Sequence, residues 1–345
     1  MITAFLLAIV FFASLAATGM LVRHVGIFAI LDQPNERSLH VRPTPRTGGV
    51  GILTGIVLGV ALTLAYALFE EVFAQVRPEL LWIVGMLLLI ATVSLVDDRH
   101  HLPPLLRLFF HLLAASGVVL GGGVAVEQVT IPFLGSYSLG VLAAPLSIVV
   151  ITWTTNLYNF MDGMDGLAAS MSVFGFTLIS GLALQAHDVP LALLAAIVVP
   201  AVIGFLFHNR PPASIFMGDS GSTSLGFLAG ALGIAGIDRG DFHLGTWLLA
   251  FSPFLVDATV TLLRRAMQRK RIWQAHREHY YQRLVLSGWS HRRTLGWEAA
   301  VMMLFAWTAF FFERGSDLPR LAILIGAIAL YLVLIAAVRR VETRK

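Results

Sequence analysis

Long apolar runs alternate with short polar segments along the whole chain. A helix that spans a membrane needs roughly 20 mostly apolar residues. Eleven segments meet this requirement: 1–22, 48–69, 80–97, 105–126, 140–155, 164–185, 190–208, 220–236, 243–263, 295–313 and 319–338. The first lacks the positive start of a signal peptide and is too long for one, so we interpret it as a helix. The pattern predicts an all-α integral membrane protein, a polytopic bundle of about 10 to 11 helices, with residues 1–345 as one domain.

Composition supports this class and excludes others. Hydrophobic residues make up 57% of the chain and charged residues 13%, and the mean hydropathy is +0.80. These values exclude a water-soluble globular enzyme. The chain has no cysteine, which excludes disulfides, a thiolate zinc site and a cysteine nucleophile.

Basic residues are distributed unevenly between the two sides of the predicted bundle. The net charge is +4 and the sequence pI is about 9.8. Twenty of the 24 Lys and Arg lie in alternate connecting segments: 23–47, 98–107, 209–219, 264–294 and the tail from 339. The positive-inside rule places these segments in the cytoplasm, the N-terminus in the periplasm and the C-terminus in the cytoplasm. The basic character therefore indicates topology and contact with membrane lipids, and we expect no nucleic-acid partner.

Two adjacent carboxylates, Asp97 and Asp98, end an apolar run. Charge at the edge of the hydrocarbon is unfavourable and usually functional, and an aspartate at the C-terminal end of a helix opposes the helix dipole. The alternative is a helix end that faces lipid headgroups. Neighbouring side chains of a helix point about 100° apart, so we expect the two aspartates to have different roles.

Asn156, Asn159, Asp162 and Asp165 follow one another at intervals of three. This spacing places them along one side of a helical or near-helical stretch. A glycine after each aspartate interrupts that stretch and lets the backbone approach a ligand closely. Aspartate–glycine pairs are also ordinary turn formers, but a plain turn does not need four polar groups in phase.

The segment 207–222 leads from polar residues directly into an apolar helix. Asp219 or Ser220 could cap that helix. A carboxylate, a hydroxyl and free backbone N–H groups at a helix N-terminus could also hold a metal and a phosphate together. Both interpretations can apply to the same residues.

Two further basic segments belong to the same side. Residues 269–271 are typical of anchors for anionic lipid, whereas His276, Arg277 and His279, followed by two tyrosines, are donors suited to a diphosphate. Residues 32–49 combine prolines with three arginines and a histidine, and either organise the cytoplasmic face or bind phosphate. Most residues capable of chemistry therefore face the cytoplasm.

Taken in order, these motifs resemble those of the polyprenyl-phosphate N-acetylhexosamine-1-phosphate transferases, bacterial envelope enzymes related to the phospho-N-acetylmuramoyl-pentapeptide translocases. The resemblance covers about residues 32–284. It rests on these motifs: Arg-x-x-His-x-x-Pro-Thr-Pro-Arg-x-Gly-Gly at 37–49, Asp-Asp at 97–98, Asn-x-x-Asn-x-x-Asp-Gly-x-Asp-Gly-Leu at 156–167, Phe-Met-Gly-Asp-Ser-Gly-Ser at 216–222 and Gln-Arg-Leu at 282–284. It implies an inner-membrane enzyme that transfers a sugar 1-phosphate from a UDP-sugar to undecaprenyl phosphate with Mg²⁺, or alternatively Mn²⁺, and releases UMP.

The resemblance also implies roles for single residues. Asp97 and Asp98 match the catalytic aspartate pair, and Asp219 and Asn159 match positions associated with the metal. Asn156, Asp162 and Asp165 match positions near the nucleotide, and His276, Arg277 and His279 lie in the segment expected to contact the diphosphate. The sequence does not say which of the aspartate pair takes a proton and which orients the lipid phosphate.

One departure from the family pattern bears on the sugar. His279 is followed by Tyr280 and Tyr281, where several relatives carry further histidines. This form resembles the branch that initiates O-antigen, and a phenol ring edge suits a sugar whose C6 is a methyl group. We therefore expect UDP-activated 6-deoxy sugars, N-acetylfucosamine or N-acetylquinovosamine, with an initiator specific for UDP-N-acetylglucosamine as the alternative.

Two other classes of protein are compatible with eleven spans. Secondary transporters also carry polar residues at helix breaks, but they place them near the middle of the bilayer, whereas here they gather at one face. A catalytically silent scaffold is the second alternative, and the intact acidic motifs argue against it. The pattern leaves the oligomeric state, including a homodimer, open.

Overall fold

The computed structural model describes residues 1–23, 30–33, 43–69, 77–270 and 276–343 of the chain. Within them lie twelve α-helices, one π-helical turn, one 3₁₀ turn and four short strands. The helices are α1 (Ile2–Arg23), α2 (Gly48–Phe69), α3 (Pro78–His100), α4 (Pro104–Ser116), α5 (Ala143–Met161), α6 (Leu167–Gln185), α7 (Val189–Asn209), α8 (Gly218–Asp238), α9 (Leu244–Met267), α10 (Tyr280–Leu286), α11 (His291–Arg314) and α12 (Asp317–Thr343). The strands are β1 (Leu31–Asp32), β2 (Thr44–Pro45), β3 (Gln128–Ile131) and β4 (Gly135–Ser138).

The predicted membrane architecture is confirmed. In the described part of the chain, eleven helices are long and apolar enough to cross a membrane, and each corresponds to one of the eleven predicted segments. The short α10 is not among them, so it connects two spans rather than forming one. The protein is thus a polytopic all-α membrane protein.

The elements differ from the predicted spans most clearly at two places. The run 105–126 is not one helix, because α4 passes into a π-helical turn, Gly117–Gly121, and three successive glycines end the helix there. The chain then forms an antiparallel β3–β4 hairpin that hydropathy did not indicate. At the other place, a 3₁₀ turn at Gly140–Leu142 precedes α5, which extends to Met161 rather than 155.

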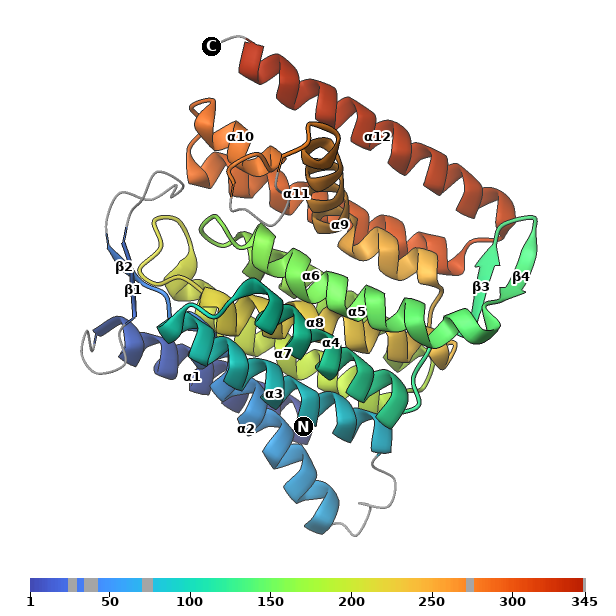
Figure 1. The fold of residues 1–345 in the computed structure, drawn as a ribbon. Helices are drawn as coiled ribbons and strands as arrows, with labels where there is room; N and C mark the ends of the chain where they lie inside the picture. Colours follow the sequence, from blue (N-terminus) through green and yellow to red (C-terminus); the bar gives the residue numbers. More distant parts are fainter. Residues whose placement is uncertain (24–29, 34–42, 70–76, 271–275, 344–345) are drawn as a thin grey trace.

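The helices form two groups in space, as Figure 1 shows. Helices α9 to α12 lie on one side, and α1 to α8 lie on the other with α8 among them. Almost all of α8 is buried, whereas α12 buries no residue and runs along the outer edge. The strands β1 and β2 lie at one end of the bundle and the β3–β4 hairpin lies at the opposite end.

Close helix contacts depend on small residues. Gly51, Gly55 and Gly59 recur every four residues along α2, on the side that meets α1 and α7. A Cβ atom at Gly51 would lie 2.1 Å from Oγ1 of Thr18 on α1. In a membrane, where no hydrophobic effect drives helices together, such close backbone packing supplies the attraction.

Helix α8 is positioned by the same means and by hydrogen bonds. A Cβ atom at Gly226 would lie 2.5 Å from the backbone carbonyl oxygen of Thr154 on α5. The hydroxyls of Ser94 on α3 and Thr223 on α8 are 2.8 Å apart. The first contact holds α8 against α5. The second holds the start of α8 against the end of α3, where Asp97 and Asp98 lie.

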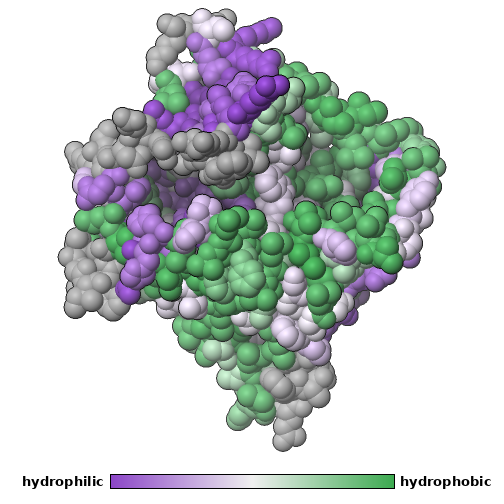
Figure 2. All heavy atoms as spheres, in the orientation of Figure 1, coloured by the Kyte–Doolittle hydropathy of each residue, from purple (hydrophilic) through white to green (hydrophobic). Residues whose placement is uncertain are grey.

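The hydrophilic surface lies mainly at one end. Figure 2 shows hydrophobic residues over most of the visible face and hydrophilic residues gathered around α10 and the β1–β2 strands, with a smaller group at the opposite end. At that opposite end Arg77 and Arg239 both pair with Asp188, the N-cap of α7. The few basic residues there are thus engaged in contacts that join helices.

Candidate active site

Asp98 joins the end of α3 to the beginning of α8. One carboxylate oxygen accepts the backbone N–H of Asp219 at 3.1 Å and the other accepts that of Ser220 at 3.0 Å. Asp98 is 1% exposed. A carboxylate at the N-terminal end of a helix is stabilised by free N–H groups and by the helix dipole. The unfavourable position of Asp98 at the end of α3 is therefore offset by α8.

Neither Asp219 nor Ser220 caps α8, so that interpretation of the sequence is wrong. The N-cap residue is Met217, and its side chain makes no capping bond. The Asp219 carboxylate instead accepts a hydrogen bond from Nδ2 of Asn159 on α5, at 2.8 Å. The carboxylate of Asp98 accepts the backbone N–H groups in the first turn of α8. The Asp219 side chain is therefore not needed as a cap and can face the site.

Arg107 links two of the predicted carboxylates. Its Nη1 lies 3.0 Å from Oδ2 of Asp97 and 3.4 Å from Oδ2 of Asp219. The other oxygen of Asp97 accepts the backbone N–H of Leu102 at 2.6 Å, where the chain turns from α3 into α4. About a third of the Arg107 and Asp219 side chains is exposed, whereas Asp97 is almost buried. This cluster of Asp97, Arg107 and Asp219 is therefore the accessible part of the acidic site.

Asn156 and Asn159 lie on successive turns of α5, as predicted. Nδ2 of Asn159 also approaches Oγ of Ser222 on α8, at 3.2 Å. The side chain of Asn156 meets a different partner, Nδ1 of His111 on α4, at 3.3 Å. Asn159 thus connects α5 to α8, and Asn156 connects α5 to α4.

Asp162 and Asp165 do not continue the helix, which corrects the expectation of one aligned stretch. Helix α5 ends at Met161, and both aspartates lie in the loop before α6. Oδ2 of Asp165 accepts the backbone N–H of Ala213 at 3.1 Å and lies 3.2 Å from Nδ1 of His291. Asp165 therefore holds the 211–214 loop and α11 in place.

Asp162 is the other aspartate of this loop. Burial, followed by the negative charges of Asp219, Asp98 and Asp165, raises the pKa of the Asp162 carboxyl well above its usual value. The Asp162 carboxyl is therefore affected by the acidic residues around it.

The segment before α2 packs beside the segment before α8. The backbone N–H groups of Gly48 and Gly49 donate to the carbonyl oxygens of Phe216 and Met217, at 2.9 and 2.7 Å. Nη2 of Arg46 donates to the backbone carbonyl of Asp98 at 2.7 Å and lies 3.5 Å from its carboxylate. This end of the 32–49 loop therefore supports the acidic site. The remainder, 34–42, lies outside the described residues.

Asp257 of α9 organises the histidine segment. Its carboxylate lies 3.1 Å from Nδ1 of His279 and accepts the backbone N–H of Tyr280 at 2.9 Å. His279 is 2% exposed, and its backbone N–H donates to Oε1 of Gln282. His279, expected from the sequence as a donor to the diphosphate, is therefore a buried residue that fixes the start of α10.

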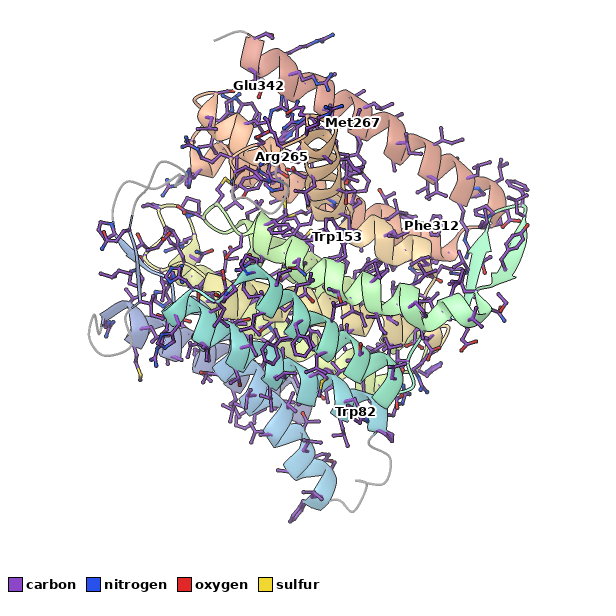
Figure 3. The ribbon with its side chains drawn as sticks, viewed as in Figure 1. Trp82, Trp153, Arg265, Met267, Phe312 and Glu342 are labelled. Carbon is purple, nitrogen blue, oxygen red and sulfur yellow. The ribbon has the colours of Figure 1, made fainter. Side chains whose placement is uncertain are left out.

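The other residues of this segment have different surroundings. His276 is half-buried, and burial, followed by the charges of His279 and Arg265, lowers its pKa to about 4. Glu278 pairs with Arg264, Arg265 and Lys270. Figure 3 shows Arg265 at the end of the bundle that carries α10. Among the described residues no carboxylate pairs with Arg277, so its charge is available to an anion.

Tyr281 brings the histidine segment next to the 162–166 loop. Its ring is fully buried and stacks on His279, with ring centroids 6.0 Å apart. A Cβ atom at Gly163 would lie 2.3 Å from the Tyr281 Oη. The two predicted motifs are therefore adjacent, and only glycine at 163 allows this approach.

The acidic cluster is suited to a hard cation that is shared with a substrate. Asp97, Asp219 and Asn159 offer oxygen atoms, which Mg²⁺ prefers. Within the described ranges no three His, Asp or Glu side chains form a metal cage of their own. Mg²⁺ commonly takes one or two carboxylates and completes its shell with water and substrate phosphates. The residues present fit that mode of binding.

Four residues of this region were not identified from the sequence as site residues. The sequence marks Arg107 only as a basic residue of a connecting segment, and Arg46 only as part of a proline-rich loop. His111 and Asp257 lie inside predicted spans, and an ionisable residue within a span is by itself an indication of function. That signal was available and could have found both.

The chain is similar in sequence to known proteins. Residues 80–237 match the family model of glycosyl transferase family 4. The chain is 30% identical to a decaprenyl-phosphate N-acetylglucosaminephosphotransferase of Mycolicibacterium smegmatis, over 94% of this chain and 86% of the relative. It is 30% identical to a "probable undecaprenyl-phosphate N-acetylglucosaminyl 1-phosphate transferase" of Bacillus subtilis (77% and 72%). It is also 30% identical to a phospho-N-acetylmuramoyl-pentapeptide-transferase of Picosynechococcus (81% and 75%).

These similarities and the fold define a class of integral membrane transferases. The chain belongs to glycosyl transferase family 4, together with the polyprenyl-phosphate N-acetylhexosamine-1-phosphate transferases and the phospho-N-acetylmuramoyl-pentapeptide transferases. The resemblance drawn from the motifs is confirmed.

Proposed function

We propose that this chain transfers N-acetylhexosamine 1-phosphate from a UDP-sugar to undecaprenyl phosphate and releases UMP. Its family supports the coarser activity, sugar-1-phosphate transfer to a prenyl phosphate. The observation that carries the proposal is the convergence of Asp97, Asp98, Asp219 and Asn159 where α3 and α5 end and α8 begins. That end also carries most of the basic residues, which suits two anionic reactants.

The reaction is a displacement at phosphorus. An oxygen of the lipid phosphate forms a bond to the phosphorus that carries the sugar, and the bond from that phosphorus to the bridging oxygen breaks, so that UMP leaves. Such a step needs positioning and neutralisation of charge above all. The lipid acceptor enters from the membrane and the nucleotide from water, so a site at the end of a bundle can receive both.

We assign different roles to the two adjacent aspartates. Both oxygens of Asp98 accept backbone N–H groups of α8, so Asp98 positions the first turn of that helix. Asp97 is also buried, but it shares Arg107 with the partly exposed Asp219. We therefore propose Asp97 as the residue that orients the lipid phosphate or takes its proton, and Asp98 as a positioning residue.

Asp219 and Asn159 are the residues proposed to hold Mg²⁺, with Mn²⁺ as an alternative. When bound, the cation would neutralise charge on the diphosphate. The amide of Asn159 fixes the orientation of the Asp219 carboxylate through the 2.8 Å hydrogen bond between them. Arg107 supplies a second positive charge beside the same carboxylate.

Residues around the cluster are proposed to bind the rest of the donor. The Asp162 carboxyl is affected by the acidic residues around it, and Arg277 has a charge available for a phosphate. His276, with its lowered pKa, is neutral near pH 7 and can donate one hydrogen bond. Asn156, Asp165 and His279 are engaged within the protein, so we propose that they shape the nucleotide site rather than contact the phosphates.

The sugar is the least constrained part of the proposal. Tyr281 is fully buried, and Tyr280 packs against the guanidinium of Arg283, 4.9 Å from the ring centroid. Neither ring presents an open face to a C6 methyl group. We therefore propose N-acetylglucosamine, which the names of two relatives also contain. The 6-deoxy sugars that the sequence favoured are the alternative donor.

Competition between UDP-N-acetylglucosamine and its 6-deoxy analogue for undecaprenyl phosphate, scored by lipid product, tests the choice of sugar. A pocket built around a methyl group discriminates against a hydroxyl by about 10- to 200-fold at most. A predominantly 6-deoxy product would contradict N-acetylglucosamine as the donor sugar and would support the expectation that Tyr280 and Tyr281 favour a C6 methyl group. The reaction class would stand with either donor.

The wider context is part of the same proposal. We place the enzyme in the bacterial inner membrane with its N-terminus in the periplasm and its C-terminus in the cytoplasm. Its product would begin O-antigen or another envelope polysaccharide, and a homodimer is compatible with the exposed apolar faces.

Release of UMP by the purified chain tests the reaction class. UMP should appear only when a UDP-sugar, undecaprenyl phosphate and Mg²⁺ are all present. Uptake of the nucleotide sugar into proteoliposomes without UMP release would instead indicate a transporter. Inactivity in both assays would favour a silent scaffold.

A further inference from the structure

A large cavity lies at the site end of the bundle, outside the acidic cluster. Its volume is about 820 Å³. It is bounded by the end of α7 and the 211–214 loop, by Ser170 at the start of α6, and by Arg292, Gly296 and Ala299 on α11. None of the carboxylates of the candidate active site lines it. The cavity is therefore distinct from the acidic cluster.

The polar part of this cavity is cationic. Arg210 and Arg292 line it together with His208, and none of the lining residues is acidic. Nε of Arg292 donates to the carbonyl oxygen of Pro211 at 3.1 Å, which ties α11 to the loop after α7. In the described part of the chain no carboxylate pairs with either arginine. Two guanidinium groups thus line one cavity, and their charges are available to bind an anion.

The remaining wall is apolar and continues along the helices. From Ala299, steps of four residues along α11 lead to Met303 and Trp307, which are 48% and 57% exposed. Phe207 of α7 lines the cavity and is 50% exposed. Side chains four residues apart lie on one face of a helix, so this apolar face runs from the cationic end toward the middle of the spans.

We propose that this cavity binds the headgroup of an anionic membrane phospholipid, with the acyl chains against α11 and Phe207 of α7. Basic pockets between transmembrane helices at the cytoplasmic side are suited to such headgroups, and a guanidinium pairs well with phosphate oxygens. A free phosphate would contact only the cationic end, whereas a phospholipid would contact both the cationic end and the apolar face. The combination of both surfaces is what selects a lipid.

Binding of dioleoyl-phosphatidylglycerol to the delipidated full chain, measured by native mass spectrometry, tests the proposal. Arg210→Gln and Arg292→Gln should each weaken binding about fivefold, the contribution of one basic residue near an anionic headgroup. Arg293→Gln is the matched control, because Arg293 follows Arg292 on α11 but lies 3.9 Å over the ring of Trp289 and does not line the cavity. It should bind the lipid like the wild type.

A second pair of variants tests the apolar wall without changing charge. A Cβ atom at Gly296 meets nothing within 4 Å, so Gly296→Phe fills the cavity without a clash in the fold. It should reduce phosphatidylglycerol binding at least fivefold. Gly85→Phe on α3, which also has open space, is the control and should leave binding unchanged.

Three results would overturn the proposal. Equal binding by all variants would show that the lipid contacts the protein elsewhere. Displacement of phosphatidylglycerol by millimolar inorganic phosphate would indicate a site for a free anion. Stronger binding of undecaprenyl phosphate, lost in Arg292→Gln, would assign the cavity to the acceptor. Dioleoyl-phosphatidylcholine, with the same chains and no net charge, should bind wild type and arginine variants equally weakly.

Discussion

Nη1 of Arg107 lies 3.4 Å from Oδ2 of Asp219, although the two residues are separated by 112 positions in the chain. The same nitrogen contacts Asp97, so one guanidinium holds two carboxylates of the candidate site together. The carboxylates at this end of the bundle therefore have cationic partners, Arg107 and Arg46, that their own motifs do not contain.

Replacing Arg107 by glutamine should lower turnover by roughly 10- to 100-fold, because a positive charge beside the reacting phosphates is lost and two carboxylates repel each other. Arg107→Lys should retain part of the activity. UMP release by purified protein measures the effect. Arg99→Gln is the control, because Arg99 is exposed on α3 and belongs to no ion pair within the described residues. Equal activity of the glutamine variants at 107 and 99 would remove Arg107 from the mechanism.

The acidic residues should separate into two kinds when each is changed to asparagine. Asp97→Asn and Asp219→Asn should lose about 10²-fold or more in turnover and keep a thermal midpoint near that of the wild type. Asp98→Asn should also lower the midpoint, because an amide nitrogen cannot accept the N–H bond that one carboxylate oxygen receives from α8. Near-native rates of the first two variants with Mg²⁺ would contradict the site.

Half-buried His276 should make stability depend on pH. Its pKa is lowered to about 4 from the usual 6.5, so the unfolded chain binds the proton more readily. Stability associated with this group is therefore present above pH 6.5 and is lost as the pH falls toward 4. His276→Gln should show a smaller drop in thermal midpoint between pH 7 and 5. Exposed His100, changed in the same way, should keep the wild-type drop. An identical pH response in all three proteins would contradict the assignment.

The side on which the site lies can be measured with single cysteines, because the chain has none of its own. Cysteines at Ser214 and Ser287 should react only with reagents that reach the cytoplasm, and one at Ser316 should react from the periplasm. Ser38 should behave like Ser214, although it lies outside the described residues. Labelling of position 287 from the periplasm would reverse the proposed orientation.

The spans were predictable because the bilayer allows few alternatives. A lipid-exposed backbone must satisfy its own hydrogen bonds, so an apolar run of sufficient length is a helix almost by necessity. No such constraint acts on the connections, and there the prediction was weaker. The β3–β4 hairpin and α10 are both short. The start of α10 depends on Asp257, whose carboxylate accepts a hydrogen bond from the backbone N–H of Tyr280, 23 positions later in the chain.

The candidate site shows the same division. Residue type selected Asp97, Asp98, Asn159 and Asp219 as candidates, because carboxylates and amides beside an apolar run have few structural uses, and the structure brings these four together. Residue spacing was a poorer guide. Asp165 shares the interval of three with Asp162, yet it binds Ala213 and His291, because the helix that would align the two ends at Met161. Long-range partners such as Arg107 have no local signal at all.

The central position of α8 has a consequence for biogenesis. It is the least hydrophobic of the described spans and the most completely buried, and the helices that contact it most extensively, α2, α3 and α5, are all translated earlier. Its glycines and hydroxyl side chains are better suited to close packing against other helices than to contact with lipid. Asp97, Asp98 and Asn159 are thus already inserted when the ribosome delivers Asp219. A nascent chain that stopped before residue 218 would contain the helices that pack around α8, but it would lack Asp219 and therefore a complete site.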